Sequence, residues 1–91
     1  MSYSLIIHPK ALKEIQQLSR QDIQRVEKAI DKLQHNSRPH GYIKMSDYAS
    51  DRAQGEDCYR IRVGGNRIIY TIQDQVVTVT VIQVKKRGDI Y

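Results

Sequence analysis

Arginines at alternate positions mark a stretch of this sequence that could hold an anion. Arg60 and Arg62 lie in the run Tyr-Arg-Ile-Arg-Val, and Arg67 lies in the run Asn-Arg-Ile-Ile-Tyr. Side chains alternate between the two faces of a strand, so Arg60 and Arg62 share one face. If Gly64 and Gly65 form a hairpin turn, Arg62 pairs with Arg67. Paired like charges destabilise a sheet by roughly a few tenths to 1 kcal/mol. We therefore interpret this face as one that holds a phosphate backbone.

The elements that position these arginines follow from the pattern of apolar residues. Three β-branched runs, at 57–63, 66–72 and 76–84, predict a three-stranded antiparallel meander. Alternating apolar residues between 2 and 8 predict an earlier strand, and Pro9 suits the first turn of a helix. Ser19 is expected to cap a second amphipathic helix at 20–35. The apolar faces of the two helices are expected to hold Ala11, Leu12, Ile15, Leu18, Ile23, Val26, Ile30 and Leu33.

These elements predict a single α+β domain over residues 1–91, in the order β-α-α-β-β-β. We expect a twisted, mainly antiparallel four-stranded sheet, with a helical hairpin packed on one face and the arginines on the other. A long connection at 36–56 should border the basic face, and residues 42–45 could add a short extended piece to it.

The net positive charge of the chain limits the kinds of molecule that it is expected to bind. The chain of 91 residues has a net charge of +5, and residues 58–91 hold six Lys or Arg against two Asp or Glu. Such an excess is typical of proteins that bind nucleic acid, an anionic membrane or an acidic protein. We expect no membrane span and no signal peptide, and the single cysteine, Cys58, indicates a reducing cytoplasm. The three histidines lack metal-ligand spacing, so no metal or other cofactor is expected.

Arginines, lysines and a tyrosine could cleave RNA without a metal. RNA carries its own nucleophile, the 2′-hydroxyl, so a protein needs only to bend the backbone, stabilise charge and move protons. After the last strand the sequence continues with Lys85, Lys86 and Arg87 and reaches Tyr91. These side chains could bind phosphate and stack on a base.

The order of elements, with Tyr-Arg-Ile-Arg-Val, Asn-Arg-Ile-Ile-Tyr and Val-Lys-Lys-Arg-Gly-Asp-Ile-Tyr, resembles the RelE toxins of the RelE/ParE toxin–antitoxin superfamily. The resemblance implies a metal-independent endoribonuclease that cleaves mRNA in the ribosomal A site and leaves a 2′,3′-cyclic phosphate. It implies a cytoplasmic protein whose partners are a cognate antitoxin, the ribosome and mRNA. We expect a monomer alone and a hetero-oligomer with the antitoxin.

The resemblance also assigns roles to individual residues. Arg67 would stabilise the transition state, Arg87 would protonate the leaving group or hold phosphate, and Tyr91 would stack on or orient the nucleotide. The implied catalytic residues are Arg62, Arg67, Arg87 and Tyr91, and the implied phosphate-binding residues are Arg60, Lys85 and Lys86.

The sequence departs from well-known RelE proteins at the two strand positions, which are often lysines there. Arg62 is a poor general base because a guanidinium stays protonated. The proton would then pass to the ribosome, to a water, or to an acid such as Glu56 or Asp57. Two other functions stay open: a ParE-like toxin that inhibits DNA gyrase without catalysis, and a non-catalytic basic module that binds RNA.

Overall fold

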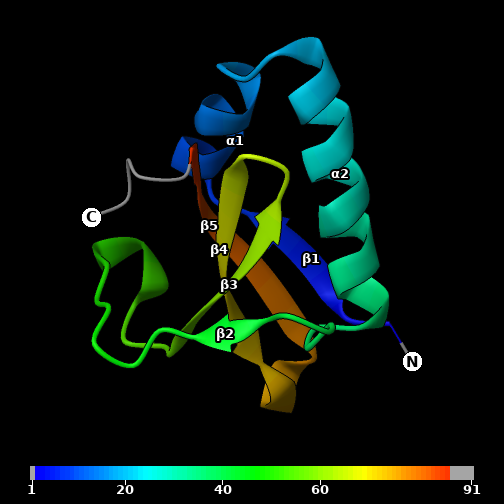
Figure 1. The fold of residues 1–91 in the computed structure, drawn as a ribbon. Helices are drawn as coiled ribbons and strands as arrows, with labels where there is room; N and C mark the ends of the chain where they lie inside the picture. Colours follow the sequence, from blue (N-terminus) through cyan, green and yellow to red (C-terminus); the bar gives the residue numbers. More distant parts are fainter. Residues whose placement is uncertain (1, 87–91) are drawn as a thin grey trace.

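The meander predicted from the sequence forms the centre of the computed structural model, which describes residues 2–86 (Figure 1). The turn at Gly64 and Gly65 joins its first two strands, and Arg62 pairs with Arg67 as predicted. Of these two glycines only Gly64 has a positive φ, of 61°, which matches a type II′ turn. The elements in chain order are β1 (Ser4–Ile7), α1 (Pro9–Gln16), α2 (Arg20–His35), β2 (Ile43–Lys44), β3 (Cys58–Val63), β4 (Asn66–Gln73) and β5 (Thr78–Lys86), with 3-10 turns at Asp51–Ala53 and Asp74–Val76.

The sheet has five strands in the order β1-β5-β4-β3-β2, where four were predicted. β1 is parallel to β5, and the other neighbours are antiparallel. The added strand, β2, has only two residues, and both Ile43 and Lys44 are exposed. So short a strand carries no alternating pattern, which is why the sequence suggested only an extended piece there. The α+β class and the mainly antiparallel pairing agree with the prediction.

The last strand begins later than its sequence pattern predicted. Asp74–Val76 forms a 3-10 turn, and Val77 has a left-handed φ of 49°. A β-branched residue rarely adopts this conformation, so apolar residues alone gave no sign of the turn. β5 therefore begins at Thr78 and not at Val76, whose side chain is exposed.

The two helices cover one face of the sheet; the predicted cap at Ser19 forms, and His8 caps the first helix, which was not predicted. His8 and Ser19 accept hydrogen bonds from the backbone N–H groups of Lys10 and Asp22, respectively, at the two N-termini. Leu12 was predicted to be buried but is 46% exposed. It follows Ala11 by about 100° around the helix, and α1 packs through Ala11 and Ile15. The helix-side core comprises Ala11, Ile15, Val26, Ile30, Leu33, Ile61, Ile68, Tyr70, Ile72, Val79, Val81 and Val84.

The long connection before β3 packs on the opposite face, so the fold has a third layer (Figure 1). Ala53 is buried there against Cys58, Ile69 and Ile82, with Met45 and Tyr48 half-buried around them. The basic face is therefore covered over part of its area, although the sequence of this connection indicated little apolar content. No helix between residues 2 and 86 has the length and hydropathy to cross a membrane.

Candidate nucleic-acid interface

Three cations from neighbouring strands lie side by side on the face opposite the helices. Arg67 of β4 pairs with Arg62 of β3 on one side and with Lys85 of β5 on the other. Paired residues project to the same face, and neighbouring strands are about 4.8 Å apart. We name Arg62, Arg67 and Lys85 the cationic row. Arg62 is exposed, and the other two are partly buried.

A β-bulge in β5 decides which of the two lysines joins the cationic row. Tyr70 pairs with Val81, whereas Ile69 pairs with Gln83, so Ile82 is the extra residue. One extra residue reverses the alternation of every side chain that follows. Ile82 is buried against the connection, Val84 is buried against the helices, and Lys85 lies on the face of Arg67.

Lys86, which the sequence grouped with Lys85, is opposite Asn66 and therefore belongs to the helix side of the sheet. It is exposed. The structure does not bring Lys86 into the row. Arg87 and Tyr91, predicted as catalytic, lie outside the described residues.

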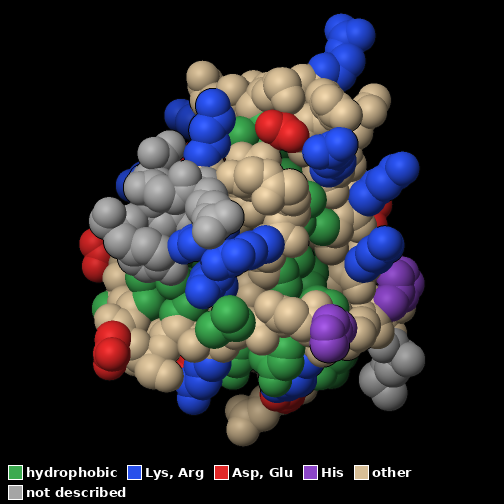
Figure 2. All heavy atoms as spheres, viewed as in Figure 1, with side chains coloured by type: hydrophobic (Ala, Val, Ile, Leu, Met, Phe, Trp, Pro, Cys, Tyr) green, Lys and Arg blue, Asp and Glu red, His purple; other side chains and the backbone are tan. Residues whose placement is uncertain are grey.

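Arg60 lies on the same face as Arg62, two residues earlier on β3. It pairs with Ile43 of β2 and Ile69 of β4, so its neighbours are apolar. Two residues of strand span about 7 Å. Figure 2 shows Lys and Arg side chains over the β3–β4 hairpin and hydrophobic side chains beside them over β2. Arg60 thus connects the cationic row to an apolar surface.

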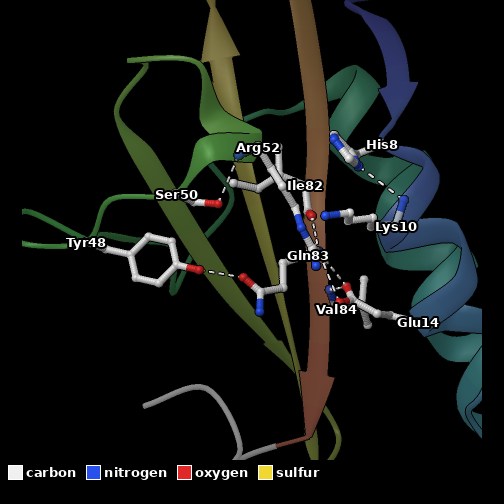
Figure 3. A network of polar contacts seen from close by, with 9 residues as sticks. All are labelled: His8, Lys10, Glu14, Tyr48, Ser50, Arg52, Ile82, Gln83 and Val84. Atoms are coloured by element: carbon white, nitrogen blue, oxygen red, sulfur yellow. Dashed lines mark hydrogen bonds and ion pairs between the residues drawn. The ribbon is translucent and has the colours of Figure 1, made fainter.

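Two side chains hold the part of β5 that carries Lys85. β1 pairs with β5 only as far as Val81, so the following residues lack a strand partner on that edge. Glu14 of α1 accepts a hydrogen bond from the Val84 N–H at 3.0 Å, and Arg52 donates to the Ile82 carbonyl at 2.9 Å (Figure 3). Glu14 and Arg52 also form an ion pair of 3.0 Å, with each side chain 21% exposed. This ion pair links α1 to the connection across the edge of the sheet.

The connection is held to β5 at a second point. The Tyr48 hydroxyl donates to the Gln83 side-chain oxygen (Figure 3), and Gln83 is only 8% exposed. Gln83 directly follows the bulge residue Ile82, so the bulge supplies both an apolar and a polar contact to the connection. Burial, and secondarily the charge of Asp57, raises the pKa of the neighbouring Cys58 thiol.

Two acids that the sequence offered as general bases lie far from the cationic row. Glu56 and Asp57 precede β3, whereas Arg62 is near its other end. Five residues of strand separate Asp57 from Arg62, or about 16 Å. Asp57 forms an ion pair of 3.3 Å with Lys44, and Glu56 accepts from Gln73 at 3.2 Å. Among residues 2–86, no group of three His, Cys, Asp or Glu side chains could hold a metal.

One cation near the hairpin was missed by sequence reasoning. Arg25 of α2 was interpreted as part of a solvated helix face. Its guanidinium lies 3.4 Å from the position that a Cβ on Gly64 would occupy. Arg25 is therefore next to the turn that precedes Arg67, and no pattern within the helix itself could indicate this.

Solved structures of RelE toxins share the fold. The archaeal RelE–RelB complex from Pyrococcus horikoshii contains a chain that is 27% identical, with a TM-score of 0.79 over 98% of this chain and 99% of that chain. The isolated E. coli RelE toxin is 26% identical, with a TM-score of 0.71 over 99% and 92% of the two chains. A chain of the intact E. coli RelBE toxin–antitoxin complex is 27% identical, with a TM-score of 0.69 over 96% and 99%. No curated protein matches the sequence.

A family model confirms the superfamily that the motifs suggested. The model described as the ParE toxin of type II toxin–antitoxin systems, parDE, matches residues 5–91. This match spans nearly the whole chain and begins at the second residue of β1. The chain therefore belongs to the ParE toxin family of type II toxin–antitoxin systems, within the RelE/ParE superfamily.

Proposed function

We propose that this toxin is a metal-independent endoribonuclease that cleaves mRNA in the ribosomal A site and so inhibits translation. The cationic row is the observation that carries the proposal. Three cations on adjacent strands repel one another, and the phosphate backbone of RNA is an anion that can lie across such a row. The resemblance to RelE toxins supplies the reaction class.

The chemistry requires one displacement at phosphorus. The 2′-oxygen of the RNA attacks the adjacent phosphorus, the bond from phosphorus to the 5′-oxygen breaks, and the products are a 2′,3′-cyclic phosphate and a 5′-hydroxyl. Arg62 and Arg67 bind the non-bridging oxygens and stabilise the charge that grows on them. Lys85 holds the same phosphate as a point charge. By the resemblance, Arg87 would donate the proton that the leaving 5′-oxygen takes up or would hold phosphate, and Tyr91 would stack on or orient the nucleotide.

The proton of the 2′-hydroxyl needs an acceptor outside the cationic row. Guanidinium groups remain protonated, and Glu56 and Asp57 are at the other end of β3. We propose that the ribosome, or a water held there, accepts this proton. The isolated protein should then be a weak nuclease, and cleavage should depend on ribosomes.

The proposed partner that neutralises the toxin is a cognate antitoxin. Two of the similar solved structures are described as toxin–antitoxin complexes, of RelE with RelB and of RelBE. An acidic segment that covers the cationic row would block mRNA. Co-expression of the antitoxin should rescue growth, and charge reversal by Arg67→Glu should weaken the complex.

A second function is favoured by one observation. The matching family model is that of ParE toxins, and by the resemblance the ParE branch inhibits DNA gyrase without catalysis. In that case the same cations would contact a protein or DNA and cleave nothing.

Primer extension on a reporter mRNA in a translation extract tests the proposal. The wild type should cut between codon positions in frame, and ribosome depletion should abolish the cuts. Arg67→Ala should reduce cleavage about a hundredfold or more, the usual cost of removing one transition-state donor. Lys28→Ala removes an exposed cation from α2 and should leave cleavage unchanged. Intact mRNA together with lost gyrase supercoiling would establish the ParE-like function instead.

A further inference from the structure

A cavity of about 340 Å³ opens beside Arg60, at the edge of the sheet. Residues 43–48 and Arg60 line it, so its wall is β2 with the turn that follows. Its volume lies at the lower end of the range that small-molecule sites occupy. Nothing in the proposed cleavage step uses this cavity.

The wall of the cavity is held in place by several contacts. The Tyr48 N–H donates to the Met45 carbonyl at 3.2 Å, which closes a turn at Ser46 and Asp47. The Met45 N–H donates to the Cys58 carbonyl at 2.8 Å, and the Tyr48 hydroxyl donates to Gln83. The cavity is therefore formed before any ligand arrives.

The composition of the wall suits a flat aromatic ligand with polar edges. Ile43, Met45 and Tyr48 supply apolar and aromatic surface, and Ser46 and Asp47 supply hydrogen-bonding groups at the rim. Arg60 adds a guanidinium, which can lie against the face of a nucleobase. Unstacked bases of single-stranded RNA are bound by this combination of aromatic, apolar and guanidinium surfaces.

Arg60 also places the cavity next to the phosphate site. It shares a face with Arg62 and lies about 7 Å from it along β3, a distance that one nucleotide step can span. We propose that this cavity holds one unstacked nucleobase of the RNA strand whose phosphate lies on the cationic row. This inference rests on the proposed function and adds a base-binding subsite to it.

Binding of two short fluorescent oligonucleotides tests the subsite without chemistry. Both strands carry 2′-O-methyl groups, which remove the attacking hydroxyl; one strand has bases and the other is abasic throughout. The wild type should prefer the strand with bases. Ser46→Trp fills the cavity and should lower this preference about tenfold, which corresponds to roughly 1.4 kcal/mol and lies within the range for one stacked base. Ala49→Trp, an exposed neighbour outside the cavity, should leave the preference unchanged.

Salt dependence separates the subsite from the cationic row. Ser46→Trp should weaken binding without changing the slope of log affinity against log salt, because the cavity binds no phosphate. Arg62→Ala should make that slope shallower by about 0.7, the value for one phosphate contact on a single strand. Ile43→Asp, at a position 46% exposed, provides a second variant if Ser46→Trp alters the circular dichroism spectrum.

Two outcomes would overturn the subsite. Equal wild-type binding of the two strands excludes it, whether or not the protein cleaves mRNA. If Ser46→Trp keeps the preference for the strand with bases but binds the antitoxin more weakly, the cavity holds a side chain of the antitoxin and not a nucleobase. A base preference that Ser46→Trp lowers, in a protein that cleaves no mRNA, refutes the proposed function but leaves the nucleobase site.

Discussion

The two faces of the sheet differ in how far they are covered. Among residues 2–86, twelve buried residues form the cluster on the helix side and four form the cluster under the connection. The cationic row begins where the smaller cluster ends. Stability is thus concentrated on one face, and the other face carries the cationic row beside its smaller cluster. This separation lets one small domain maintain a core and a basic surface together.

Substitutions at Ile68 and Ile69 test most directly whether the two faces of the sheet contribute unequally to stability. These two residues are neighbours on β4, both fully buried, and they point to opposite faces. We expect Ile68→Ala to lower the free energy of unfolding by roughly 4 kcal/mol, and Ile69→Ala by roughly 2 to 3 kcal/mol. The second loss is smaller because the connection can collapse toward the smaller cluster. Urea denaturation with a constant m-value measures both; an equal or larger loss for Ile69→Ala would contradict the comparison.

The two halves of β5 differ in what holds them. Up to Val81 the strand pairs with the backbone of β1, and after Val81 the side chains of Glu14 and Arg52 bind its backbone. Glu14→Ala removes a charged partner from Arg52 and an acceptor from the Val84 N–H. We expect a loss of about 2 kcal/mol in the free energy of unfolding, and a smaller loss for Glu14→Gln, which keeps an acceptor. Lys13→Ala, at an exposed position of the same helix, is the control.

Hydrogen exchange locates the effect of Glu14→Ala. Exchange of the Val84 amide should accelerate more than exchange of the Val79 amide, because β1 still covers the strand near Val79. Uniform acceleration along β5 would mean that Glu14 stabilises the whole fold and not the segment with Lys85.

The fold was predictable where apolar residues recur at the regular spacing of a helix or a strand. The hairpin register, the Ser19 cap and the Arg20–His35 helix all follow from local patterns, and the structure confirms them. The extended piece at 42–45 was expected, but its pairing as β2 and the packing of the third layer were not predictable, because they depend on which distant surface the connection meets. Met45 and Tyr48 lie in a connection that has neither a helical nor a strand period, and only the fold places them against the cluster that contains Cys58.

The composition of the cationic row was predictable only in part. The glycine turn places Arg62 opposite Arg67, whereas the place of Lys85 depends on the bulge at Ile82. Strict alternation from Val81 would have put Lys86, and not Lys85, on the basic face. No residue at the bulge is a glycine, so nothing in the local pattern of residues indicates the bulge.

Labelling of Cys58 measures how readily the less covered face opens, because this thiol is buried in the smaller cluster. Burial raises its pKa, so the reactive thiolate is disfavoured as well as shielded. We expect slow labelling of the native protein by a thiol reagent at pH 8. Ile69→Ala should accelerate labelling about tenfold more than Ile68→Ala does. This corresponds to a local opening of the smaller cluster that costs roughly 1.4 kcal/mol less in Ile69→Ala than in Ile68→Ala. Equal acceleration would show that both faces open only by global unfolding.

The smallest expected effect concerns the end of β4 opposite the cationic row, where a cation is neutralised by a carboxylate. Arg38 donates to Asp74 at 2.8 Å, and the Tyr3 hydroxyl donates to the same carboxylate at 2.6 Å. The hydrogen bond from Arg38 and, to a smaller extent, the one from Tyr3 lower the pKa of Asp74 below its usual 3.8. A lowered folded-state pKa contributes stability above the unfolded-state pKa, and this stability is lost as the pH falls through the folded-state pKa.

Asp74→Asn should therefore slightly destabilise the protein at pH 7 and flatten the fall in stability below about pH 4. Both side chains are largely exposed, so 0.5 M salt should reduce the difference. In an Arg38→Gln background, Asp74→Asn should have less effect, because the hydrogen bond from Arg38, the main cause of the lowered pKa, is gone. Urea denaturation of the four proteins at pH 3 and pH 7 measures the coupling. If the pH dependence of Asp74→Asn matched that of the wild type, the ion pair would contribute nothing to the free energy of unfolding.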